Sequence, residues 1–190
     1  MRANVANSGG PGVGKSVLAA VLFAELKILG LDYDLIPEER RKLMCEMGNY
    51  RSPFERIYMW RQQEREELRS SAADGFITDT PLFHLYTQGK WYARESRDIL
   101  AVRELLRMCL ELKANGRYQI ITIPKNPEEI PYKTDNVRTS GESDARMKHA
   151  LIRSFVEHFF PDKILFVHGS AKERAAQVIC RILELRGEKE

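Results

Sequence analysis

Long apolar runs are absent from this chain of 190 residues, and no segment approaches the roughly 18 apolar residues that a membrane-spanning helix needs. The sequence opens on a short strand-like segment, and from this we expect no signal peptide. The three cysteines, Cys45, Cys109 and Cys180, lie far apart and lack the spacing of a metal site. We therefore expect reduced, mostly buried thiols in a cytoplasmic protein.

A strong excess of charge is also missing. The chain has 30 Lys and Arg residues against 27 Asp and Glu, and the two signs are mixed along its length. This balance permits a polyanionic partner without pointing to one. The sequence shows no internal repeat and no low-complexity tract, and its hydrophobic content of 43% suits a globular core. We expect one domain over residues 1–190.

The chain does contain a regular alternation of short strands and longer helices. The expected strands are 3–8, 32–36, 75–81, 118–123 and 163–167, and the expected helices lie at 15–29, 54–68, 99–112, 151–159 and 175–185. This alternation predicts a doubly wound α/β fold with a parallel five-stranded sheet covered on both faces. Its ligands should bind at the carboxyl ends of the strands.

Two details of this pattern need a structural explanation. The first strand carries Asn4 and Asn7, although a central strand should be apolar, and the sequence offers no reason for them unless one faces the site. In the helix after Pro53, one face is expected to gather five residues: Phe54, Ile57, Tyr58, Arg61 and Leu68.

The segment "GGPGVGKS", residues 9–16, matches the complete phosphate-binding loop pattern G-x-x-x-x-G-K-[ST]. Its glycines let backbone N–H groups turn inward, and the helix that follows points its positive N-terminus at the same place. Lys15 can bridge the outer phosphates of a nucleotide, and the Ser16 hydroxyl is a natural Mg²⁺ ligand. The residues expected to contact nucleotide are Gly9, Gly10, Pro11, Gly12, Val13, Gly14, Lys15, Ser16 and Val17.

Acidic residues follow the second and third expected strands. Glu38 comes after "DYDLIP" and Asp79 after "GFIT", so both should lie at the sheet edge that carries the glycine loop. One carboxylate can hold Mg²⁺ and the other can accept a proton from an attacking hydroxyl. Ordinary structural roles remain open: Glu38 suits the charged first turn of a helix, and Asp79 or Thr80 suits a helix N-cap.

A polar break with three prolines runs from about residue 124 to 141. Loops of this length in a compact domain are commonly functional, and kinases close a basic lid over the phosphates. Arg138 is the first candidate for a lid arginine, with Lys133 and Arg146 as further basic residues, while a solvated surface loop remains the alternative. The run "SGESD" indicates a helix start capped by Ser140 or Ser143.

Taken together, these motifs resemble a group of P-loop kinases that is common in bacteriophages and related to the AAA-like nicotinamide-riboside-kinase type. The match runs in order through "SGGPGVGKS", "LIPEERRKL", "WRQQERE", "FITDTPLF" and "NVRTSGESDARMKHALIRSF". Thr80 stands where the group commonly has Ser. The resemblance assigns the group's acid to Glu38, its strand-end Asp to Asp79 and its lid Arg to Arg138.

The resemblance implies Mg²⁺-dependent phosphoryl transfer from ATP, in the host cytoplasm if a phage encodes the protein. Some members resemble the kinases that phosphorylate 5-hydroxymethyluracil within phage DNA, and others are deoxynucleotide kinases. We expect a nucleoside-type hydroxyl as acceptor, foremost that 5-hydroxymethyl group. A deoxynucleoside monophosphate or nucleoside kinase is the first alternative.

A P-loop ATPase switch or DNA-associated motor is an alternative of a different class. A motor should show an apolar run that ends in adjacent acids, and this sequence has none. Five further residues could stack on a base, although aromatic side chains at such spacings are more often core: Trp60, Phe83, His84, Tyr86 and Trp91.

Overall fold

A computed structural model of the chain describes residues 2–38, 52–131 and 141–187. Its five strands form one parallel sheet in the order β2-β3-β1-β4-β5. The strands are β1 (Val5–Asn7), β2 (Tyr33–Ile36), β3 (Gly75–Thr78), β4 (Ile120–Pro124) and β5 (Ile164–Val167). The predicted doubly wound α/β fold is confirmed, and β1, which leads into the glycine loop, is the central strand.

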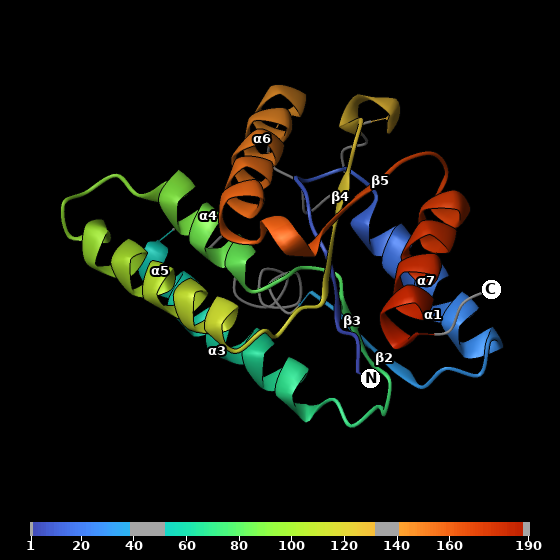
Figure 1. The fold of residues 1–190 in the computed structure, drawn as a ribbon. Coiled ribbons are helices and arrows are strands. Elements are labelled where there is room, and N and C mark those ends of the chain that lie inside the picture. Colours follow the sequence, from blue (N-terminus) through green and yellow to red (C-terminus); the bar gives the residue numbers. More distant parts are fainter. Residues whose placement is uncertain (1, 39–51, 132–140, 188–190) are drawn as a thin grey trace.

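Helices cover both faces of the sheet (Figure 1). One face carries α1 (Lys15–Ile28) and α7 (Ala171–Arg186), which pack on each other. The other face carries α3 (Pro53–Arg69), α4 (Phe83–Tyr92), α5 (Asp98–Ala114) and α6 (Glu142–Phe159). Two short 3₁₀ turns, η1 (Pro127–Glu129) and η2 (Pro161–Lys163), flank α6 in the chain.

Strand side chains alternate between the two faces, as the pleat of a strand requires. Val5 packs in the core under α1 and α7, whereas the next residue, Ala6, packs in the core under α3–α6. Ile77 and Phe76 divide in the same way along β3. The three inner strands, β1, β3 and β4, are therefore buried on both sides, which explains why the expected strands at β3 and β4 are rich in apolar residues.

The helix boundaries follow from local chemistry. Ser52 and Ser170 begin α3 and α7 with complete capping boxes, paired with Glu55 and Glu173 respectively. Helix α1 ends just before Gly30, whose φ of 74° lies in the left-handed region. Among the described residues, no helix is both long and apolar enough to cross a membrane.

The buried face of α3 differs from the predicted one. Phe54, Tyr58 and Leu68 are 46%, 54% and 67% exposed. The residues that α3 buries are instead Pro53, Arg56, Met59, Trp60, Gln63 and Glu67. Hydropathy pointed to the wrong stripe because several of the buried positions are polar and take their hydrogen-bond partners from distant parts of the chain.

The cysteine prediction holds in part. Cys109 is buried and forms no disulfide within the described residues, and burial raises the pKa of its thiol. Cys180 is an exposed free thiol on α7, so the expectation of burial is wrong there. Cys45 lies outside the described residues. The exposed position follows from α7 itself, which turns Ala175, Val178 and Ile182 toward the sheet.

The asparagines of the first strand join β1 to its neighbours. The Asn4 side chain donates to the Arg117 carbonyl at 2.8 Å and accepts from the Phe76 N–H at 3.3 Å. Asn7 Oδ1 accepts a hydrogen bond of 2.9 Å from the Thr122 hydroxyl of β4. Their polarity therefore serves the alignment of the central strand, which sets the position of the glycine loop.

Candidate active site

The glycine loop runs from the end of β1 to the start of α1. Gly9, Gly12 and Gly14 have φ values of 129°, 82° and 73°, which side-chain-bearing residues rarely adopt. Gly14 is the N-cap of α1, and the first turn of this helix has neither a side-chain cap nor an acidic residue. The first amide groups of α1 are thus left to an anionic ligand, which the helix dipole favours at this end.

The two reactive side chains of the loop have defined partners. Lys15 Nζ donates to the Gly10 carbonyl at 2.9 Å. Ser16 Oγ donates to Asp79 Oδ2 at 2.7 Å, which brings the end of β3 to the start of α1. Asp79 is 9% exposed, and its other oxygen, Oδ1, is buried without a hydrogen-bond partner among the described residues.

The alternative role of Asp79 as a helix cap is wrong. The N-cap of α4 is Leu82, and no side chain caps this helix. The buried Thr80 hydroxyl likewise accepts no hydrogen bond from the start of α4, and no partner for it is found in the described part of the chain. A carboxylate with one oxygen on a hydroxyl and one orphaned oxygen has the chemistry of a cation ligand rather than of a cap.

Glu38 stands at the neighbouring strand end. The register pairs Ile36 of β2 with Thr78 of β3, so Glu38 and Asp79 both follow the carboxyl ends of adjacent strands. Gln63 of α3 spans these ends, because its Nε2 donates to the Pro37 carbonyl and to the Thr78 hydroxyl, both at 3.3 Å. Glu38 is half-buried, and its neighbour Glu39 lies outside the described residues.

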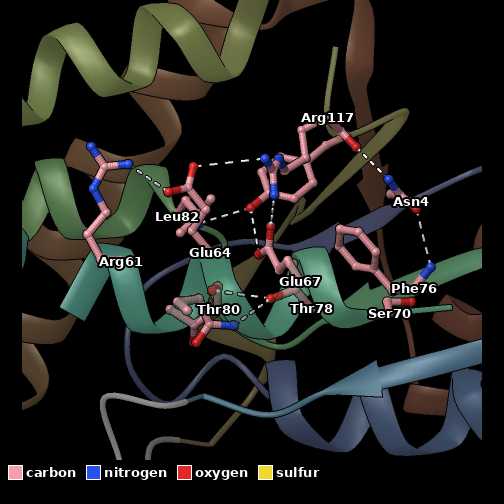
Figure 2. Close-up of polar contacts among 12 residues, drawn as sticks. Asn4, Arg61, Glu64, Glu67, Ser70, Phe76, Thr78, Thr80, Leu82 and Arg117 are labelled. Carbon is pink, nitrogen blue, oxygen red and sulfur yellow. Dashed lines mark hydrogen bonds and ion pairs between the residues drawn. The ribbon is translucent and has the colours of Figure 1, made fainter. Parts of the chain in front are cut away.

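A buried polar network holds the other end of the turn that carries Asp79 (Figure 2). The Tyr118 hydroxyl accepts from the Leu82 N–H at 3.1 Å and donates to Glu67 Oε1 at 2.8 Å. Glu67 is 2% exposed, and burial raises its pKa to about 8, outweighing the Tyr118 hydrogen bond and Arg117 at 3.7 Å. The sequence showed no sign of this network, because "EREEL" is typical of a solvated helix face.

The aromatic residues proposed as base-stacking groups have mostly structural positions. Trp60 and Phe83 are fully buried in the core, so neither stacks on a ligand in this conformation. The His84 ring lies 2.9 Å from Ser8 Oγ, just before the loop. Tyr86 packs on Phe155 with ring centroids 5.1 Å apart. Trp91 is half-buried, and Lys148 lies over its ring at 5.3 Å.

A small hollow of about 30 Å³ adjoins the loop on the α6 side. Its walls come from the loop, from the chain around η1 and from the start of α6: Pro11, Gly12, Val13, Pro127, Ile130, Glu142, Ala145, Arg146 and His149. Arg146, which the sequence offered as a further basic residue with a surface role left open, thus lies beside the loop and pairs with Glu142 at 2.6 Å. Helix α6 starts at an N-cap of Gly141 without a side-chain cap, which contradicts the expected cap of Ser143. Arg138, Lys133 and Ser140 lie outside the described residues.

Neither a protein-family model nor a curated protein matches this chain. Solved structures do match it. The NadR protein in complex with NAD and AMP-PNP superposes with a TM-score of 0.73 at 18% identity over 100% of this chain. Deoxyadenosine kinase from M. mycoides with bound dATP superposes with a TM-score of 0.60 at 15% identity over 97% of this chain.

The chain has the fold of a P-loop kinase. It spans about half of the NadR chain, 51%, and the whole length of the deoxyadenosine kinase. NadR in complex with NR gives a TM-score of 0.70 at 16% identity. Identities this low show the fold alone, so the chemistry of the present chain has to be argued from its own residues.

Proposed function

We propose that the protein is a kinase that transfers the terminal phosphoryl group of ATP to a nucleoside-type hydroxyl. The observation that carries the proposal is the 2.7 Å contact between Ser16 and Asp79. It joins a complete phosphate-binding loop to a strand-end carboxylate whose second oxygen is buried and has no hydrogen-bond partner in the described part of the chain. The fold comparisons support the same class, because kinases and AMP-PNP-bound proteins share this architecture.

Binding of ATP rests on the loop and Lys15. Backbone N–H groups of the loop after Pro11 cradle the phosphates, and the Lys15 ammonium exchanges the Gly10 carbonyl for phosphate oxygens. Ser16 and Asp79 fit Mg²⁺, since both offer oxygen ligands and Asp79 Oδ1 has no partner within the residues that the structure describes. When bound, Mg²⁺ neutralises charge on the phosphates. No cluster of three or more His, Cys, Asp or Glu side chains occurs in the described ranges, which suits an ion that keeps phosphate and water ligands.

Phosphoryl transfer then needs an acceptor and a base. The acceptor hydroxyl oxygen forms a bond to the terminal phosphorus, the bond from that phosphorus to the bridging oxygen breaks, and ADP leaves. Glu38, at the strand end beside Asp79, takes the hydroxyl proton or orients the hydroxyl. We propose a lid at about residues 124–141 in which Arg138 meets the charge that develops on the phosphoryl group, and one kinase domain over residues 1–190.

Two acceptors are favoured by different observations. The sequence resemblance favours the 5-hydroxymethyl group of 5-hydroxymethyluracil in DNA. The fold comparisons favour a free nucleoside or deoxynucleotide, because the similar structures hold NR and dATP. A base in duplex DNA has to leave the helix stack to reach such a site, whereas a free nucleoside does not.

A transfer screen tests the proposal. Terminally labelled ATP with Mg²⁺ is offered hydroxymethylated DNA, unmodified DNA, nucleosides, deoxynucleoside monophosphates or water alone, each with the wild-type chain and with Lys15→Ala. We expect transfer to one hydroxyl-bearing acceptor and its loss in Lys15→Ala, which removes the charge at the phosphates. Release of inorganic phosphate without any labelled acceptor would identify an ATPase instead, and turnover in Lys15→Ala at the wild-type rate would remove the loop from the reaction.

A further inference from the structure

The glycine loop is held from outside by two buried side chains, one on α6 and one on α7. His149 Nδ1 accepts a hydrogen bond of 3.2 Å from the Gly10 N–H. The Arg174 guanidinium donates to the Val13 carbonyl at 3.3 Å. His149 is 5% and Arg174 is 6% exposed, so both contacts are shielded from water.

Helix α6 fits against Gly10 without room for a side chain. A Cβ at Gly10 would lie 2.7 Å from the Ala145 carbonyl oxygen and 2.9 Å from the His149 backbone nitrogen. Such distances are far inside van der Waals contact, so glycine is required here by close approach rather than by an unusual φ. The start of the loop is thus fitted to the backbone of the first two turns of α6.

Packing alone does not account for the imidazole of His149. Because Nδ1 accepts from Gly10, the neutral ring carries its proton on Nε2, and Nε2 is buried with no hydrogen-bond partner among the described residues. A buried unpaired donor is costly, and an apolar residue would avoid that cost. An apolar residue, however, could not accept a hydrogen bond from the Gly10 N–H. The bond to the loop is therefore the contribution of His149 that an apolar residue could not replace.

The imidazole is kept neutral, which this bond requires. Burial is the main cause that lowers the pKa of His149 to about 4, followed by the positive charges of Lys15 and Arg153, while Glu128 acts in the opposite direction. Protonation would put a second N–H opposite the Gly10 N–H. The contact therefore persists throughout the neutral pH range.

Arg174 is buried, and none of its hydrogen-bond partners among the described residues is a carboxylate. Within the part of the chain that the structure describes, its hydrogen bonds go to the carbonyls of Val13 and Ser170, and burial lowers its pKa. The guanidinium lies against Gly14, where a Cβ would stand 3.3 Å from its Nη2. Because the C=O and N–H of a trans peptide point in opposite directions, a Val13 carbonyl held toward Arg174 turns the Gly14 N–H away from Arg174. Its charge adds to the positive N-terminus of α1, which costs energy until an anion binds.

We propose that His149 and Arg174 are positioning residues of the phosphate-binding loop, which hold its backbone ready for the polyphosphate of ATP. This inference rests on the proposed nucleotide binding, not on the transfer step. A preorganised loop gains affinity because binding no longer has to order it. Arg174 also supplies a charge that bound phosphates offset.

The test is the dissociation constant of ATP, measured calorimetrically for two variants and two matched controls. His149→Leu removes the acceptor of the Gly10 N–H, and Arg174→Met removes the guanidinium that donates to the Val13 carbonyl. Each variant is expected to weaken ATP binding about tenfold, which corresponds to the loss of one buried hydrogen bond. His158→Leu on α6 and Arg181→Met on α7 change exposed residues of the same types and are expected to leave ATP affinity unchanged. His149→Asn should restore binding, because its Oδ1 takes the place of Nδ1.

A ligand-independent readout accompanies the binding assay. In the protein without nucleotide, NMR hydrogen exchange of the Gly10 amide should speed up at least tenfold in His149→Leu and stay slow in His149→Asn. If His149→Leu does not fold, His149→Gln replaces it, since its longer side chain moves the acceptor away from Gly10. Unchanged ATP affinity in both variants, or an unchanged Gly10 exchange rate, overturns the proposal.

The outcomes also separate this inference from the proposed function. If the wild type binds ATP, the variants bind it weakly and no acceptor is phosphorylated, the positioning roles stand and the kinase proposal fails. If transfer occurs and the variants bind ATP as the wild type does, the kinase proposal stands and the positioning roles fail. A wild-type chain that binds no ATP overturns both.

Discussion

The cores on the two faces of the sheet differ in the kinds of side chain that they contain. Under α1 and α7 the fully buried hydrophobic residues are aliphatic apart from Tyr33, and they include Leu22, Leu26 and Ile182. Under α3–α6 the core mixes aromatic rings with buried polar side chains. The buried polar residues on the helices of this face are Arg56, Gln63, Glu67, His84, Thr87, Asp98 and His149.

The two faces therefore contribute differently to the candidate site: one supports the glycine loop, and the other positions the acidic residues. The aliphatic face presents α1, and with it the glycine loop, on a rigid base that needs no particular protonation state. The mixed face positions the turn of Asp79 and the end of β2 through hydrogen bonds that depend on exact partners. Arg174 is the exception, a buried charged residue on the α1 and α7 face, and it lies against the loop itself. Substitutions on the two faces should therefore fail in different ways.

The largest effect is expected where the two faces meet, at Asp79. Asp79→Asn should lower transfer by about 10³-fold or more, since the metal supplies several kcal/mol of transition-state stabilisation. The melting temperature should stay close to that of the wild type, because Asp79 caps no helix. Steady-state kinetics over a Mg²⁺ titration, with a thermal melt of the same sample, measure both. Early melting with normal turnover would make Asp79 a structural residue.

Substitution of Glu38, which follows the end of β2, tests whether this residue acts as the base for the phosphoryl acceptor. Glu38→Gln should cost about 10²–10⁴-fold in kcat with a hydroxyl acceptor, the usual range for a general base. The loss should be much smaller with a monophosphate acceptor, whose oxygen is already ionised near neutral pH. The variant is assayed against whichever acceptors the screen finds active. Full activity on a hydroxyl would exclude Glu38 and make Glu39 the next residue to test.

Leu22 of α1 probes the aliphatic face. Leu22→Ala should lower the free energy of unfolding by about 2–5 kcal/mol, the range for a fully buried leucine. Because no titrating group is involved, the loss should be equal at pH 5 and pH 8.5. Urea unfolding at both pH values checks this, with Leu110→Ala, an exposed position on α5, as the matched control. If the loss of unfolding free energy changed with pH, the stability of the aliphatic face would depend on a titrating group, and the proposed contrast between the two faces would be wrong.

Glu67 on the mixed face should show the opposite behaviour. Its pKa is raised from 4.5 to about 8 in the folded protein, so between these values the folded state holds a proton that the unfolded state has released. Stability should therefore fall as pH rises from about 4.5 to 8, and the full penalty is present above pH 8.

Glu67→Gln removes this penalty while keeping an acceptor for Tyr118. The variant should match the wild type at pH 4.5 and gain stability toward pH 8.5, by a few kcal/mol at most. Urea unfolding across this pH range measures the gain. A constant difference between the two proteins at all pH values would show that Glu67 is ionised in the folded state and that Arg117 compensates it.

Much of the architecture was predictable because its signals are local. The alternation of strands and helices, the glycine loop and the acids after two strands are each visible within about ten consecutive residues. The structure confirms the parallel five-stranded sheet and places Ser16, Glu38 and Asp79 at one edge. The roles of Glu38, Asp79 and Arg138 in transfer remain predictions.

Other features escaped prediction because they join residues far apart in the chain. The buried face of α3 was assigned wrongly, since the partners that let Glu67 and Gln63 enter the core lie on β3 and next to β4. Hydropathy treats such residues as exposed, whereas a satisfied hydrogen bond removes most of the cost of burying them.

The sequence by itself determined the order of elements and the site's reactive side chains, because backbone periodicity and loop conformation depend on neighbouring residues. Tertiary structure alone decided which residues surround that site. His149 and Arg174 reach the loop from 139 and 161 residues away, and no local pattern marks them. The loop can be recognised from eight residues, but the contacts that fix its shape form only when α6 and α7 pack against the sheet.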